Sequence, residues 1–154
     1  GGGHGVWQCR AAGASMIGRL RGEGGQALVE FSLTSLMFFT LILFLLDGSR
    51  ILWNQITLHE AAVSGARYAS IHGSASTNPQ GPGSYDNVEQ SVRDNAFGLD
   101  QTDLQIAAAW EGDSNAPGHH VTVSLTYPVT PTTSLFWGGL AVQLNASITT
   151  KVLH

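Results

Sequence analysis

The chain has 154 residues, a length typical of a single domain. Its 7 Lys and Arg residues against 11 Asp and Glu residues give a formal net charge of -4, which excludes the basic surface that nucleic-acid binding requires. The single cysteine, Cys9, has no partner for an intrachain disulfide, and no Cys and His cluster has the spacing of metal ligands. We therefore predict no nucleic-acid partner, no metal and no other cofactor.

Residues 1–25 are predicted to form a leader in front of the folded part of the chain. The stretch "GGGHGVWQCRAAGAS" is rich in glycine and alanine and lacks apolar periodicity. Met16 then opens "MIGRLRGEGGQ", which is typical of a natural translation start. We expect residues 1–15 to be either disordered or added by an over-called reading frame.

Residues 26–46 are predicted to be a transmembrane helix. The apolar run from Ala27 to Leu46 has about twenty residues, the length that crosses a hydrocarbon core of roughly 30 Å, and Glu30 is its only charged residue. A cleavable secretory signal would end in small residues, whereas this run ends in "LFLLDGSR". We expect the helix to stay in the mature protein, with the lipid bilayer as its surroundings.

The charges around this run predict its orientation. Arg19 and Arg21 precede it, and the following residues are acidic overall, which favours a cytoplasmic N-terminus. We therefore expect a single-pass protein of the cytoplasmic membrane with residues 47–154 on the extracytoplasmic side. Trp53 lies about two turns beyond the run and suits either the headgroup region or ordinary helix packing.

The helix is predicted to continue beyond the membrane. The stretch after Asp47 contains no proline until Gly73 and the following loop "GSASTNPQGPGS" provide a stop signal. Its apolar residues recur at approximately helical spacing, as Leu52, Ile56, Val63 and Ala66 do. We expect one helix from Gln26 to about Ile71.

A small helix-plus-sheet domain is predicted to follow, which makes the fold class α+β. In "SYDNVEQSVRDNAFG", either Ser84 or Asp86 can cap a short helix and Gly98 can close it in the left-handed conformation. The period then changes to alternation in three segments, which is typical of an antiparallel sheet with one wet face. The residues expected on the dry face are Leu104, Ile106, Ala108 and Trp110; Val121, Val123, Leu125 and Tyr127; and Val142, Leu144, Ala146, Ile148 and Val152.

The small residues of the long helix are candidates to cover that dry face. Ala62, Gly65, Ala66 and Ala69 would let a backbone approach the sheet closely, and a contact between subunits is the alternative. The loop after Pro128 carries an apolar cluster at residues 135–137, "LFW". This cluster either folds back over the sheet or forms a tip that binds a partner.

Glu30 is the fifth residue counted from Gln26, and Gly25 stands directly before Gln26. A short leader with two arginines and an apolar run that follows at once resembles the leader of type IV pilins. The resemblance implies a prepilin peptidase that cuts after Gly25, or alternatively after Gly24, and leaves a cationic amine on Gln26. Glu30 would then pair with that amine in another subunit and set the register of assembly; the alternative is an acid in the first turn that reaches the interface.

Three stretches together resemble the TadE-like family, the pilin-related proteins of tight-adherence (Flp) pilus systems. They are "GGQALVEF", "DGSR" from Asp47 to Arg50, and "EAAVSGARYAS" from Glu60 to Ser70. The resemblance implies a pilin-like fold and a minor pilin or pseudopilin whose partners are other pilin subunits and the assembly platform. It also draws attention to Gly65, Arg67 and Tyr68, with Arg67 and Tyr68 either anchoring the helix to the sheet or serving as a solvated arginine and a packed tyrosine. Asp47 and Arg50 are three residues apart and can pair across one turn.

No catalytic arrangement is recognisable, and we predict that the protein is not an enzyme. His119 and His120 adjoin Asp113 across an expected hairpin, but neighbouring residues of a strand point to opposite faces. The sequence contains no nucleophile elbow, phosphate loop or paired carboxylates. Two hypotheses remain: a processed pilin-like subunit, and an uncleaved single-pass anchor that presents an extracytoplasmic binding module.

Overall fold

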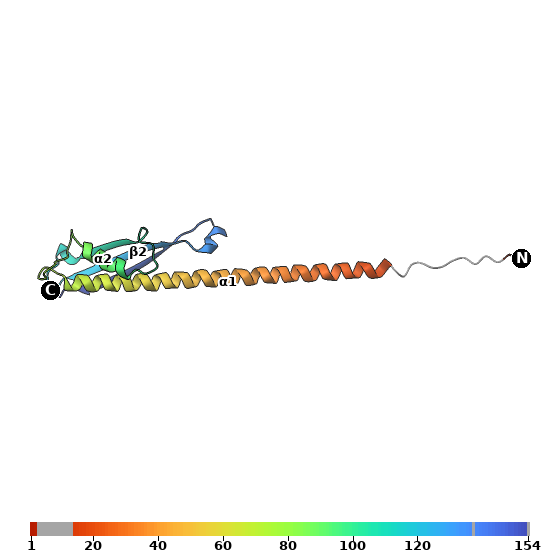
Figure 1. Cartoon of the computed structure of the whole chain (residues 1–154), viewed down its shortest axis with the longest axis horizontal. Helices are drawn as coiled ribbons and strands as arrows, with labels where there is room; N and C mark the ends of the chain where they lie inside the picture. The colour runs from red at the N-terminus through yellow and green to blue at the C-terminus, as the bar shows by residue number, and fades with distance from the viewer. Residues whose placement is uncertain (3–13, 137, 154) are drawn as a thin grey trace. The chain divides into compact units, whose positions relative to one another are not determined.

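The computed structural model describes the backbone of residues 1–2, 14–136 and 138–153, and the side chains from residue 25 on except those of 135–137 and 154. It divides into two compact units, residues 1–42 and residues 43–154. Figure 1 shows the helices and strands, which come in the order α1, α2, β1, β2 and β3 with two short 3-10 turns, η1 (Glu111–Asp113) and η2 (Thr132–Phe136). The predicted α+β class is confirmed.

Helix α1 extends from Ala14 to Ile71 without a break. Its end agrees with the prediction, but its start does not, because the helix begins at Ala14 and not at Gln26. The segment before Gln26 contains helix formers such as Met16 and Leu20, and extending a helix that is already formed needs no new nucleation step. The expectations for residues 3–13, including Cys9, lie outside the described residues.

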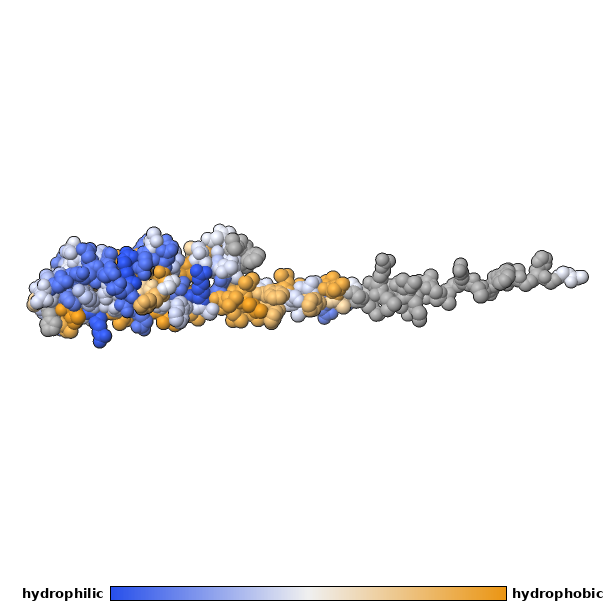
Figure 2. Space-filling model, viewed as in Figure 1, coloured by the Kyte–Doolittle hydropathy of each residue, from blue (hydrophilic) through white to orange (hydrophobic). Residues whose placement is uncertain are grey.

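The described side chains of the first unit form an apolar surface. Every large apolar side chain from Leu28 to Leu41 is exposed, and Figure 2 shows hydrophobic residues along this part of α1. Among the described residues, one helix, α1 from Gly25 to Ile71, is long and apolar enough to cross a membrane. Because such a surface is unfavourable in water, this unit has the composition of a segment that lies in lipid.

The second unit contains one antiparallel sheet of three strands in the order β1-β2-β3. Strand β1 (Gln105–Trp110) pairs with β2 (His120–Val129), and β2 pairs along its whole length with β3 (Val142–Lys151). The pairing aligns Trp110 with Val121, and Val129 with Val142. The predicted number and direction of strands are confirmed.

The two faces of the sheet differ as the alternation predicted. On the dry face, Val121, Val123 and Leu125 are at most 1% exposed, and Leu104 and Trp110 are also buried. On the wet face, side-chain hydrogen bonds join β2 to β3 in a ladder: Thr122 with Thr149 at 2.9 Å, Ser124 with Ser147 at 3.1 Å, and Thr126 with Asn145 at 3.0 Å. The cross-strand pairs therefore fix the register on both faces.

A face of α1 and the short helix α2 (Asp86–Asn95) cover the dry side of the sheet. Leu58, Ala61, Ala62, Ala66 and Ala69 of α1 are at most 2% exposed and belong to one core cluster with the sheet. The prediction that the small residues of the long helix cover the sheet is confirmed for Ala62, Ala66 and Ala69. Short side chains allow the helix backbone to approach its neighbours closely.

The apolar residues that indicated helical spacing do not mark the buried face of α1. Leu52 and Ile56 are 65% and 61% exposed, Val63 is 39% exposed, and of the four only Ala66 is buried. Trp53 is 66% exposed, so it is not a packing residue of its own unit. The buried face of this part of α1 therefore consists of Leu58 and several alanines, whereas Leu52, Ile56 and Val63 face outward.

Helix α2 agrees with the sequence at Gly98 and differs in its N-cap. Val88 and Val92 are fully buried, and Gly98 has a φ of +79°, as expected for the left-handed position. The N-cap residue is Tyr85, without a side-chain cap bond, and neither Ser84 nor Asp86 has this role. Because Asp86 is already in the first turn, its charge suits the helix dipole there.

Candidate functional site

The expected processing position lies on an open part of α1. Gly25, Gln26 and Glu30 are exposed, and a Cβ atom added at Gly25 would meet nothing within 4 Å. Among the residues whose side chains the structure describes, none forms an ion pair with Glu30. The carboxylate is therefore accessible to a partner from outside the chain.

Asp47 has a different role from the pairing expected with Arg50. Its Oδ1 accepts a hydrogen bond from the backbone N–H of Thr132 at 2.9 Å, and its Oδ2 accepts one from that of Thr133 at 2.7 Å. Within the described part of the chain no ion pair joins Asp47 to Arg50. Asp47 is 6% exposed, and its carboxylate satisfies two N–H groups at the start of η2 that have no partner in the turn itself.

These hydrogen bonds also change the acidity of Asp47. The N–H groups of Thr133, and then of Thr132, lower its pKa from 3.8 to about 2, against the opposing effect of burial. The side chain is therefore charged over the whole physiological pH range. The sequence contains little local signal for this contact, because Thr132 follows 85 residues later in the chain.

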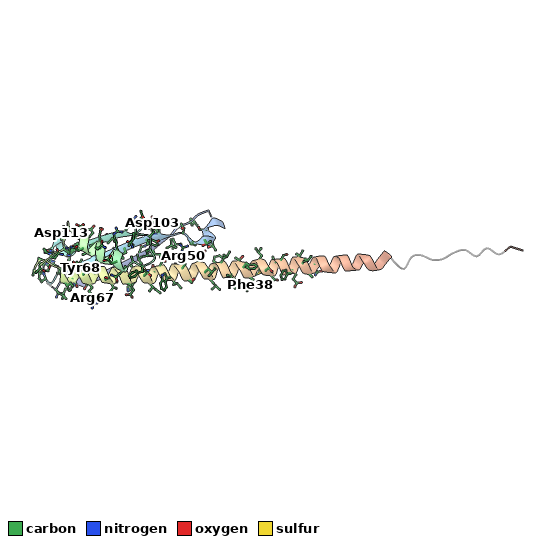
Figure 3. All side chains as sticks on the ribbon, in the orientation of Figure 1. Phe38, Arg50, Arg67, Tyr68, Asp103 and Asp113 are labelled. Carbon is green, nitrogen blue, oxygen red and sulfur yellow. The ribbon has the colours of Figure 1, made fainter. Side chains whose placement is uncertain are left out.

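Arg50 borders a polar hollow of about 320 Å³ between α1, the segment after α2 and the end of β2. Asn54, Asp100, Asp103 and Tyr127 are among the other lining residues, and Figure 3 shows Arg50 on the side of α1 that faces the sheet. The N–H and hydroxyl of Thr102 bind the carboxylate of Asp100 at 2.9 Å and 2.8 Å, and they lower its pKa. Charges of both signs thus line the hollow.

Gly65 lies where α1 packs against α2 and β2. A Cβ atom at this position would overlap Cγ2 of Val92 and would lie 3.5 Å from Cγ1 of Val123 and 3.7 Å from Cγ1 of Val88. Its backbone has an ordinary helical conformation, so the absence of a side chain serves close packing and not a special φ. Within the stretch "EAAVSGARYAS", Gly65 is a packing residue.

Arg67 and Tyr68, the next two positions of that stretch, face different surroundings. Arg67 is exposed, and its side chain lies on the side of α1 away from the sheet (Figure 3). Tyr68 is half-buried against the core, and its ring stacks on that of His72 with centroids 4.0 Å apart. The structure therefore places a solvated arginine and a packed tyrosine here.

His119 and His120 both contact Glu111 and not Asp113. Nδ1 of His120 is 2.8 Å from the Glu111 carboxylate, whereas Nδ1 of His119 is 3.1 Å from the Glu111 backbone oxygen. The contact with His120 lowers the pKa of Glu111. The Glu111 carboxylate, the exposed ring of His120 and the half-buried ring of His119 form a hydrogen-bond group near the surface.

Among the described residues, α1 is the one helix long and apolar enough to cross a membrane, and residues 43–154 form an α+β unit. This is the arrangement of a single-pass membrane protein. A family model described as TadE-like protein matches residues 25–67. The match covers the apolar run and much of the remaining length of α1, and it confirms the resemblance expected from the sequence. The matched residues make up less than half of the chain, and the sheet lies outside them.

Neither the curated proteins nor the solved structures contain a significant match to this chain.

Proposed function

We propose that this protein is a minor pilin or pseudopilin-like component of a tight-adherence (Flp) pilus assembly or secretion system. Residues 26–46 hold it in the cytoplasmic membrane, its N-terminus is cytoplasmic and residues 47–154 are extracytoplasmic. The observation that carries the proposal is the TadE-like match over residues 25–67, which begins at the glycine expected before the cleavage site. The apolar surface of α1 from Leu28 to Leu41 supports the membrane location.

A prepilin peptidase removes the leader after Gly25 in this proposal. Gly24 and Gly25 are adjacent in α1, and each costs a helix about 1 kcal/mol relative to alanine. This pair is therefore a weak point of the helix, where the backbone opens most easily for a protease. The cut leaves the apolar helix intact and gives Gln26 a new terminal ammonium.

Glu30 selects the register in which subunits assemble. A unit pair about 4 Å apart attracts by about 4 kcal/mol at an effective dielectric near 20, before the cost of desolvation is subtracted. Glu30 is exposed, so its carboxylate can meet the Gln26 ammonium of another subunit. Only one axial offset of two helices brings these groups together.

The exposed apolar face of α1 beyond the membrane is the second contact with other subunits and with platform proteins. Leu52, Ile56 and Val63 lie on one side of the helix at its period of 3.6 residues per turn, and all three are exposed. This face begins where the membrane-spanning residues end. A helix of another subunit can therefore pack along this face outside the membrane.

The mature N-terminus tests the proposal. Co-expression with a prepilin peptidase, followed by intact-mass measurement, should give a chain that begins at Gln26. Gly25→Leu should keep the leader and Gly24→Leu, the matched control, should still be cut; the reverse pattern would place the cut after Gly24. Native, working protein that retains its leader would overturn the proposal.

An uncleaved anchor that presents a binding module is the second candidate. The polar hollow beside Arg50, Asp100 and Tyr127 favours it, because charges of both signs in one hollow suit a small zwitterionic or hydrogen-bonding ligand. This candidate would be supported over the first if the native protein keeps its leader and if Glu30→Ala leaves crosslinking to partner pilins unchanged.

A further inference from the structure

The loop between β2 and β3, residues 130–141, is held at the end of the apolar run. Asp47 is the first charged residue after Glu30 in the sequence, so it marks the membrane boundary of α1. Its carboxylate binds the backbone N–H groups of Thr132 and Thr133, the first residues of η2. The start of the loop therefore lies within hydrogen-bonding distance of the residue that leaves the bilayer.

The composition of this loop suits a lipid surface. No Asp, Glu, Lys or Arg occurs between Val121 and Thr150, and the loop sequence includes "SLFWGGL". Among the described side chains, Leu140 is 69% exposed, and Val142 at the start of β3 is 41% exposed. An exposed leucine in an uncharged segment is unfavourable in water and favourable among acyl chains.

Backbone contacts occur within the described residues of the loop, 130–136 and 138–141. Gly138 and Gly139 have φ values of +83° and +78°, which glycine adopts without strain. The N–H of Gly139 donates a hydrogen bond to the carbonyl oxygen of Ser134 at 2.8 Å. These contacts satisfy backbone groups within the loop, which is a condition for placing irregular backbone near lipid.

We propose that the β2–β3 loop is a second membrane contact, which rests in the headgroup region of the same bilayer that α1 spans. Asp47 positions it there, and Leu140 is the described side chain that enters the acyl boundary. We call the two hydrogen bonds from Thr132 and Thr133 to Asp47 the clamp. The occupant of this surface is lipid and not protein, because the clamp places the loop at the bilayer boundary whether or not another subunit is present. The inference rests on the membrane-spanning part of the proposed function and not on cleavage or pilus assembly.

Nitroxide labelling of the full chain in lipid alone tests the proposal. Cys9→Ser provides a background without cysteine, and Leu140→Cys and Ser147→Cys each introduce one label site, Ser147 being an exposed control on the wet face of β3. The protein is reconstituted into vesicles of phosphatidylethanolamine and phosphatidylglycerol. Collision rates with oxygen, which concentrates in lipid, and with a water-soluble nickel chelate are then compared.

The label at position 140 should collide several-fold more often with oxygen, relative to the nickel chelate, than the label at position 147. Equal ratios at the two positions would overturn the proposal and would leave a protein partner as the occupant. No peptidase or pilin is present, so this result does not depend on whether the leader is cut after Gly25. Failure of cleavage and failure of the lipid contact are thus measured separately.

A second variant tests the role of Asp47. Asp47→Ala, combined with Leu140→Cys, removes both acceptors for Thr132 and Thr133 and should lower the oxygen-to-nickel ratio towards the value at position 147. Unchanged near-ultraviolet circular dichroism shows that the sheet unit remains folded in this variant. A ratio that stays high would mean that the loop reaches lipid without the clamp, which would overturn the positioning role of Asp47.

Discussion

Gly65→Ala tests the close packing of α1 against the rest of its unit. In an open helix, replacing glycine by alanine stabilises the protein by about 1 kcal/mol. Gly48 is the matched control, because it also lies in α1 and a Cβ atom there would meet nothing within 4 Å. At Gly65 the new methyl group would overlap Cγ2 of Val92, and Val is too stiff at χ1 to move aside freely.

The magnitude follows from these opposing effects. Overpacking in a well-packed core costs about 1–3 kcal/mol, which offsets or exceeds the gain in helix propensity at Gly65. For a domain near 100 residues, 1 kcal/mol corresponds to about 4 °C in Tm. We therefore expect Gly48→Ala to raise Tm by about 4 °C, and Gly65→Ala to leave it unchanged or lower it by up to about 8 °C.

The assay is thermal unfolding of the full chain in detergent, followed by near-ultraviolet circular dichroism. Combining Gly65→Ala with Val92→Ala makes room for the new methyl group, so the double variant should lose less stability than the two single losses together. A Tm increase in Gly65→Ala equal to that in Gly48→Ala would refute the packing argument.

Three further predictions concern other positions on α1. Glu30→Ala should insert into the membrane normally, as judged by protease accessibility, but should crosslink less to partner pilins; unchanged crosslinking would contradict the register role. The folded-state pKa of Asp47 is about 2, below its ordinary 3.8, so its stabilising effect is complete above about pH 4 and is lost as pH falls towards 2. Thermal unfolding measured from pH 5 to pH 2 should therefore depend less on pH in Asp47→Asn, and equal dependence would argue against the clamp. Leu58→Ala should cost about 2–5 kcal/mol because Leu58 is fully buried. Leu52→Ala, at an exposed position, should change stability by less than about 0.5 kcal/mol while it weakens the crosslinks; equal losses would contradict the assigned faces of α1.

The sheet was predictable from the sequence because its signal is local. Alternation along a strand assigns each residue to one face, and the residues of β2 from Val121 to Leu125 follow it in the structure. The small-residue stripe at Ala62 and Ala66 was likewise readable, because residues four apart share a helix face. In both cases the spacing of residues and the size of their side chains were sufficient to predict which residues are buried.

The contacts that depend on distant parts of the chain were not predictable in the same way. The sequence suggested Arg50 as the partner of Asp47, since it lies one turn away, whereas the structure supplies the N–H groups of Thr132 and Thr133. The larger apolar residues of α1 after Asp47, such as Leu52 and Ile56, predicted the helix but not which of its sides is buried. Helical spacing alone does not decide between the large apolar residues and the small-residue stripe, because the buried side also depends on the shape of the partner.

The ladder of hydroxyl and amide groups on the wet face of the sheet has a consequence for the environment in which the protein works. The links from Thr122 to Thr149, from Ser124 to Ser147 and from Thr126 to Asn145 contain no ionisable group. Neither acidity nor dissolved salt changes how such groups are hydrated to any large degree. These three links therefore keep the same geometry and the same hydration in dilute fresh water and in brine.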